Sequence, residues 1–180
     1  MQRYVEKVAY TAIFTALALI LSYVESVIPL SLILPIPGFK PGFANLAVAA
    51  AFFIVGPIPA IAVSFIRILV NALLFGSVTS FMFSLSGGIS AYITLVLYSL
   101  VLKKILGTIG LSVISAAMHN IGQCICAAIF FGYGVIIFYL PVLLIISLFT
   151  GTMTGVLLYF VLTRVPVIYE YGRTEGKKGV

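Results

Sequence analysis

Charged side chains are almost absent from the middle of this chain. From residue 9 to residue 163 only five are present, and apolar runs follow one another with short breaks between them. A helix that crosses a bilayer needs about 20 apolar residues, and a chain in lipid must bond its backbone groups within helices or a closed barrel. Because the runs lack the alternation of barrel strands, we expect an all-α membrane protein.

The composition of the whole chain excludes several other classes. Of the 180 residues, 63% are hydrophobic and 8% are charged, and the mean hydropathy is +1.28. A soluble domain is about half apolar and about a quarter charged. We therefore exclude a disordered chain, a nucleic-acid-binding domain and an ordinary cytosolic enzyme.

Proline and glycine residues divide the apolar region into six expected spans. We expect a single domain over residues 1–163, folded as a six-transmembrane-helix bundle, and a basic cytoplasmic tail over residues 164–180. The expected spans, by residue number, are 9–28, 43–55, 58–75, 79–102, 109–131 and 135–163.

The basic residues indicate how such a bundle is oriented. Cytoplasmic loops of membrane proteins carry an excess of lysine and arginine. With six spans, the opposite face holds only Lys40, whereas an odd number would separate the two basic termini. We therefore expect both termini in the cytoplasm and a multi-pass protein of the cytoplasmic membrane. The basic residues on the cytoplasmic face are Arg3, Lys7, Lys103, Lys104, Arg164, Arg173, Lys177 and Lys178.

Several polar residues fall within the expected spans or the outer loop. An ionisable side chain at the bilayer centre costs roughly 2.5–3.5 kcal/mol, so such residues are candidate sites. If both termini are cytoplasmic, these polar residues lie at the membrane midplane or between the midplane and the outer surface. This placement predicts a substrate pocket open to the outside. Arg67, Lys40 and His119 would favour an anionic or carbonyl group. The candidate substrate-binding residues are Glu25, Lys40, Asn45, Arg67, Asn71, His119, Asn120 and Gln123.

Most candidates also have a structural interpretation, which Arg67 alone resists. Glu25 could pair with Arg67 or Lys40 as a structural bridge. The amide side chains could form interhelical hydrogen bonds, and His119 could be a packed neutral donor.

Two strips of small residues allow helices to approach closely. Ala12 and Ala16 form one strip, and Gly151 and Gly155 form the other. One strip would serve packing within the bundle and the other would dock a second membrane subunit, and the sequence leaves open which does which.

The residues needed for catalysis are missing. The chain has no GxxxxGK[ST] loop for ATP. One His and two Cys that point in different directions make no credible metal site. The chain contains no Asp, whereas prenyl-transfer enzymes hold Mg²⁺-diphosphate with aspartate clusters. We therefore expect a non-catalytic protein with no cofactor, no metal and no nucleic-acid partner.

Three segments together resemble a known membrane family. They are KPGFANL continuing to the glycine at residue 76, SLSGGISA at residues 84–91, and AAMHNIGQCICA at residues 116–127. These motifs resemble the family labelled heptaprenyl diphosphate synthase component I, also called the Gx transporter family, which is similar to the substrate-binding S components of energy-coupling factor (ECF) transporters.

The resemblance implies an S-component-like six-helix bundle in a bacterial inner membrane, with a substrate pocket under the loop after the first helix. It implies that Ala12 and Ala16 dock on a transmembrane coupling subunit and that separate ATPase subunits supply energy. In this resemblance Lys40, Asn45 and Arg67 take the places of the family's Lys, Asn and Arg. His119, Asn120 and Gln123 form its HN-x-x-Q motif.

Two functions are therefore the main candidates, and a self-associating transporter that works without ATPase subunits is a third. The first is a substrate-binding membrane subunit that takes up a small anionic or amphipathic molecule from outside. The alternative is a non-catalytic membrane subunit of polyprenyl diphosphate or quinone biosynthesis, which would hold a prenyl synthase at the membrane.

Overall fold

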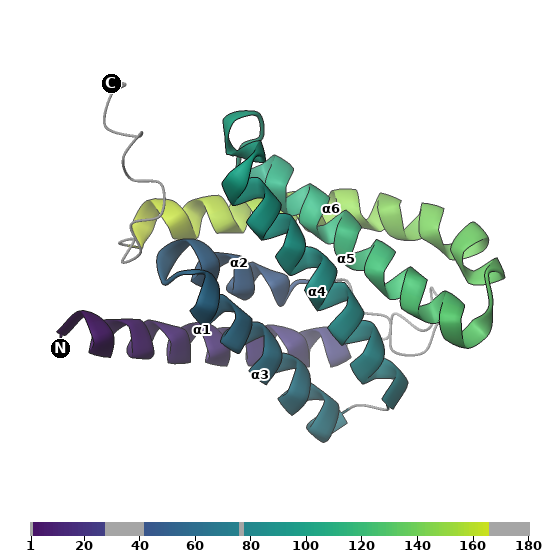
Figure 1. Cartoon of the computed structure of the whole chain (residues 1–180), viewed down its shortest axis with the longest axis horizontal. Helices are drawn as coiled ribbons and strands as arrows, with labels where there is room; N and C mark the ends of the chain where they lie inside the picture. The colour runs from purple at the N-terminus through teal and green to yellow at the C-terminus, as the bar shows by residue number, and fades with distance from the viewer. Residues whose placement is uncertain (1, 28–41, 76–77, 166–180) are drawn as a thin grey trace.

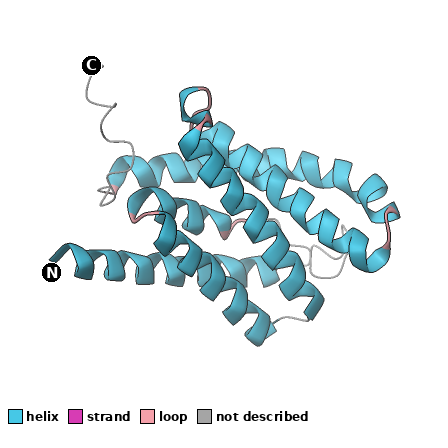
Figure 2. Cartoon of the chain, viewed as in Figure 1, coloured by secondary structure: helices cyan, strands magenta, loops and turns pink. Residues whose placement is uncertain are grey.

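The protein is a bundle of six α-helices, with no strand in the part of the chain that the structure describes (Figures 1 and 2). The computed structural model describes residues 2–27, 42–75 and 78–165. A short 3₁₀ turn, η2 (Leu102–Lys104), precedes the fifth helix. The helices are α1 (Gln2–Val27), α2 (Asn45–Ile54), α3 (Pro57–Phe75), α4 (Val78–Leu100), α5 (Thr108–Phe131) and α6 (Gly134–Arg164).

Five of these helices are long and apolar enough to cross a membrane. The sixth, α2, has 10 residues, which is about 15 Å at 1.5 Å per residue. This is about half of a 30 Å hydrocarbon core. The described residues therefore form a multi-pass membrane protein with five full-length spans and one half-length helix, where we expected six spans.

Glycines on both sides explain why α2 is short. Gly42 and Gly56 have positive φ angles, +85° and +130°, that other residues rarely adopt. Pro57 then begins α3, in a position where its missing N–H costs nothing. The segment before α2 is proline-rich, but residues 28–41 lie outside the described part of the chain.

Helix α2 forms the centre of the bundle. It packs against α1, α3, α4 and α6, and it contributes more buried residues to the main apolar core than any other helix. Alanines at four of its positions allow the neighbouring helices to approach closely. The buried residues of α2 are Ala47, Val48, Ala49, Ala50, Ala51, Phe52 and Ile54.

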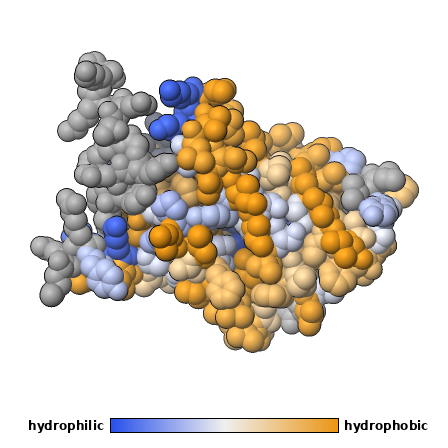
Figure 3. Space-filling view, in the orientation of Figure 1, coloured by the Kyte–Doolittle hydropathy of each residue, from blue (hydrophilic) through white to orange (hydrophobic). Residues whose placement is uncertain are grey.

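The two ends of the bundle differ. The start of α1, the α2–α3 turn and the end of α6 lie toward the same end, whereas the α5–α6 connection lies at the opposite end (Figure 1). The visible face between them is mostly hydrophobic (Figure 3), and large apolar side chains such as Leu73 and Ile129 are more than three-quarters exposed. This distribution suits lipid contact around the bundle.

The glycine strip of α6 serves packing within the bundle. A Cβ atom added to Gly151 would lie 2.5 Å from the Cα atom of Val113, and one added to Gly155 would lie 2.8 Å from the Cα atom of Ile109. Both neighbours are backbone atoms of α5. The backbones of α5 and α6 are therefore in contact, and this strip is not exposed for another subunit.

We expect Gly151→Ala to destabilise the protein by about 1–3 kcal/mol, because the added methyl group meets backbone that cannot move away easily. Gly134→Ala on the same helix is the matched control, since a Cβ there meets no atom of the described residues within 4 Å. Apparent melting temperatures of the two variants in detergent, followed by size-exclusion chromatography, test this. Equal melting temperatures would contradict the close α5–α6 contact.

Candidate functional site

Four polar side chains from three helices form a chain of hydrogen bonds inside the bundle. Arg67 on α3 donates from Nη2 to Oδ1 of Asn45 at the start of α2, over 2.9 Å. Nδ2 of Asn45 lies 3.0 Å from Nδ1 of His119 on α5, and Nε2 of His119 lies 2.9 Å from the carboxamide of Gln123. Arg67, His119 and Gln123 are at most 4% exposed. We call these four residues the polar network.

Glu25, near the end of α1, lies beside the polar network. Its Oε1 atom accepts a hydrogen bond of 3.2 Å from the backbone N–H of Ala44, immediately before α2. The carboxylate also interacts electrostatically with the Arg67 guanidinium. A negative charge is stabilised at a helix N-terminus, so Glu25 supports both the start of α2 and the buried Arg67.

Two glycines of α4 make room for the polar network. A Cβ atom at Gly87 would lie 2.6 Å from Cε1 of His119, and one at Gly88 would lie 2.9 Å from Cδ1 of Ile68 and 3.8 Å from Nη2 of Arg67. The α4 backbone therefore packs directly on the network, which shields it from lipid.

The hydrogen bonds of Asn71 and Asn120 are made outside the polar network. Asn71 contacts α1, where Ser26 Oγ donates to its Oδ1 over 3.3 Å. Asn120 faces α6 and donates from Nδ2 to the Leu143 carbonyl at 3.1 Å and to Ser147 Oγ at 2.7 Å. Both contacts are interhelical bonds, one of the structural alternatives that the sequence left open. Lys40 lies outside the described residues.

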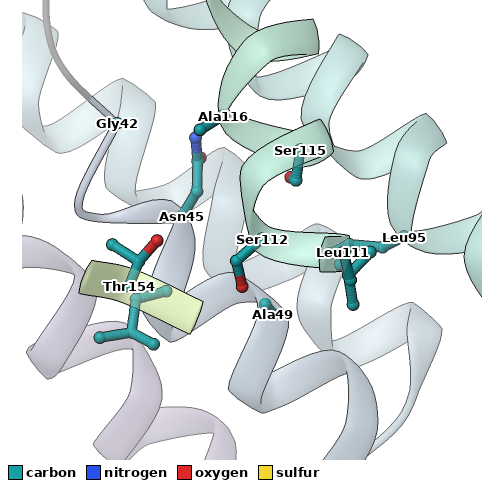
Figure 4. A pocket seen from close by; sticks show the side chains of 10 residues that line it. Gly42, Asn45, Ala49, Leu95, Leu111, Ser112, Ser115, Ala116 and Thr154 are labelled. Atoms are coloured by element: carbon teal, nitrogen blue, oxygen red, sulfur yellow. The ribbon is translucent and has the colours of Figure 1, made fainter. Parts of the chain in front are cut away.

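A small cavity, lined by both polar and apolar residues, borders the polar network on the side of Asn45. Its volume is about 20 Å³, which is enough for one water molecule. Figure 4 shows Asn45, Ser112 and Thr154, from three different helices, around this space. Ser112 and Ser115 are not among the residues predicted from the sequence, although their spacing to His119 places all three near one face of α5.

Two atoms of the polar network have no hydrogen-bond partner among the residues that the structure describes. They are Nε of Arg67 and Oε1 of Gln123, both fully buried. A buried polar atom without a partner costs about 1–3 kcal/mol. The two ends of the network are therefore the places where a ligand could supply the missing hydrogen bonds.

Comparison with known families agrees with the motifs that surround this site. The family described as heptaprenyl diphosphate synthase component I matches residues 14–161. The chain belongs to this family. The match contains every residue of the polar network and reaches from within α1 to within α6. No match was found among curated proteins or among solved structures.

A groove between α1 and α3 is the second candidate region of this protein. Its volume is about 680 Å³. Ala12 and Ala16 both line it and are exposed. The hydroxyls of Thr11 and Thr15, which also line it, donate to backbone carbonyls one turn earlier on α1. The walls of the groove are therefore apolar apart from Tyr4 and Lys7 at one end. Its lining residues are Tyr4, Lys7, Val8, Thr11, Ala12, Thr15, Ala16, Leu19, Ile58, Pro59, Ala62 and Ile66.

We expect Asn120→Leu to lower the stability by about 1 kcal/mol, because two hydrogen bonds between α5 and α6 are lost. Since Asn120 faces α6, the variant should retain any ligand that co-purifies with the wild-type protein. Gln123→Leu is the comparison, because it changes the polar network itself. Melting curves and mass spectrometry of extracted small molecules measure both effects. Loss of ligand in Asn120→Leu without loss of stability would place Asn120 in the ligand site.

Proposed function

We propose that this protein is a substrate-binding membrane subunit, similar to an ECF S component, that takes a small anionic or amphipathic molecule from the outer side of the membrane. The polar network, with Glu25 beside it and the predicted contribution of Lys40, is the proposed binding site. The observation that carries this proposal is the buried Arg67 at the N-terminus of the half-length helix α2.

A break in a membrane helix favours ligand binding at that point. Many transporters bind substrates where a helix starts within the membrane, since its N-terminal dipole favours anionic groups. Helix α2 is about half as long as a span and begins beside Arg67. A guanidinium in this position suits a carboxylate or phosphate.

The proposed orientation is that of the sequence analysis, with both termini in the cytoplasm. The start of α1 and the end of α6 lie at the same end of the bundle (Figure 1), and Lys103 and Lys104 lie in the η2 turn between α4 and α5. An excess of basic residues at that end favours the cytoplasmic side. The polar network would then open toward the outside.

The family's description names a synthase, but we propose that this subunit is not catalytic. Synthesis of prenyl diphosphates requires carboxylates that hold Mg²⁺ on the diphosphate. The chain has no Asp and four Glu, and of the two Glu in the described residues, Glu6 and Glu25, only Glu25 lies beside the polar network. The residues of the network suit binding of a ligand better than prenyl transfer with release of diphosphate.

The groove between α1 and α3 is the proposed docking surface for a transmembrane coupling subunit, which would work with separate ATPase subunits. Ala12 and Ala16 would admit a closely packed helix. The family's description favours a second candidate, in which the protein holds a prenyl synthase at the membrane. The two candidates predict different partners.

We expect Arg67→Met to abolish co-purification of a small-molecule ligand, because it removes the charged donor of the site. The variant leaves Glu25 buried beside a neutral side chain, so we pair it with the double variant Glu25→Gln/Arg67→Met, which restores the charge balance. Mass spectrometry of extracts from equal amounts of folded protein compares both with the wild type. Ligand that is retained at wild-type level in the folded double variant would contradict the proposed site.

We expect Ala12→Leu/Ala16→Leu to reduce co-purification of the coupling subunits at least tenfold, because leucines would fill the groove. Ala9→Leu is the matched control, since Ala9 is exposed on α1 but does not line the groove. Affinity purification from native membranes, followed by protein identification, measures this. Recovery of a prenyl synthase in place of ATPase subunits would favour the second candidate.

A further inference from the structure

The hydrogen bonds of the polar network can be assigned a direction, beginning at Arg67. An arginine side chain has donors and no acceptor. The Asn45 atom 2.9 Å from Arg67 Nη2 must therefore be the oxygen, Oδ1, as the structure has it. The carboxamide of Asn45 is thus fixed, and its Nδ2 group donates to Nδ1 of His119 over 3.0 Å.

This direction determines the tautomer of His119. A neutral imidazole has one N–H donor and one acceptor nitrogen. Because Nδ1 accepts from Asn45, the proton resides on Nε2, which must donate. The backbone carbonyl of Gly87 also interacts with the ring. If Nδ1 donated to Gly87 instead, however, the N–H groups of His119 and Asn45 would oppose each other at 3.0 Å.

The orientation of the Gln123 carboxamide follows from the tautomer. Its Nε2 atom lies 2.9 Å from Nε2 of His119, which would place two donors against each other. Nitrogen and oxygen of a carboxamide are assigned from such networks. If the Gln123 carboxamide is rotated by 180°, its Oε1 atom faces the ring and accepts a hydrogen bond from Nε2 of His119. Its NH₂ group then points away from the ring.

The rotated carboxamide changes what the network offers to a ligand. The NH₂ group of Gln123 then occupies the position that has no hydrogen-bond partner among the described residues. At the other end, the unpartnered atom is Nε of Arg67, which is also a donor. Both ends of the polar network therefore present N–H groups, and neither presents an acceptor.

We propose that these two groups, the NH₂ of Gln123 and the Nε–H of Arg67, bind acceptor oxygens of the ligand, as found in a carboxylate, a phosphate or a carbonyl. His119 is a positioning residue that stays neutral with its proton on Nε2 and holds the Gln123 carboxamide in place. The proposal rests on the proposed function only in that the ligand is the molecule this site takes up. A ligand that can only donate hydrogen bonds does not fit these two groups.

Nuclear magnetic resonance of ¹⁵N-histidine tests the tautomer without any knowledge of the ligand, because His119 is the only histidine in the chain. We expect Nδ1 to resonate as an unprotonated nitrogen and Nε2 as a protonated one, in nanodiscs at neutral pH. Gln123→Glu should keep this pattern, since a carboxylate also accepts from Nε2. Asn45→Asp should reverse it, since a carboxylate there can only accept. A wild-type proton on Nδ1 overturns the assignment.

Titration with acetate and with inorganic phosphate tests the binding step. We expect at least one of these acceptor probes to shift the His119 Nε2 resonance saturably, and methylammonium chloride at equal ionic strength to leave it unchanged. Gln123→Glu removes the NH₂ donor but keeps the contact with His119, so it should weaken the response at least tenfold. A response to methylammonium, or an unchanged acetate and phosphate response in Gln123→Glu, overturns the proposal.

The results separate this proposal from the proposed function. Suppose that the protein shows the expected tautomer and probe response but takes up no substrate together with its partners. This result would support the acceptor-binding site and contradict the transport role. Uptake by a protein whose proton lies on Nδ1 would support transport and contradict the acceptor site.

Discussion

The arrangement of this bundle depends on burying the N-terminus of α2. A helix that starts within a membrane protein exposes backbone N–H groups that no lipid can satisfy. Here the carbonyls of Gly42 and Phe43 accept from the first residues of α2, and Glu25 accepts from Ala44. The same place holds the guanidinium of Arg67. The buried charges are thus a consequence of the half-length helix as well as a candidate site, because the dipole, the carboxylate and the guanidinium stabilise one another.

Close packing around α2 makes this arrangement possible. Small residues along α2 and the glycines at positions 87 and 88 of α4 bring backbones near the polar network. Such packing excludes lipid and water, which strengthens the hydrogen bonds inside and makes any unpartnered atom costly. A site of this kind is sensitive to the number and direction of hydrogen bonds that a ligand brings, more than to its apolar area.

The sequence predicts the helices well and the contacts of their polar residues less well. Breaks at glycine, proline and basic residues placed every helix limit except the start of α1 within two residues, and charge placement separated Arg67 from the basic ends. The spacing of four residues relates His119 to Gln123, which are bonded to each other. The same spacing relates Arg67 to Asn71, whose side chain accepts a hydrogen bond from Ser26 of α1 instead. Helical spacing shows which residues share a face, but it does not show which neighbour that face meets.

The chemical character of the polar network comes from the one of its four residues that cannot accept a hydrogen bond. Asparagine, glutamine and neutral histidine can each be turned or change tautomer, so a network of these residues alone would have no fixed direction. Arg67 removes this freedom because it can only donate, and each following bond then has one possible direction. An arginine at this position determines more than a local positive charge. Through Asn45 and His119, it also determines that the far end of the network is a donor.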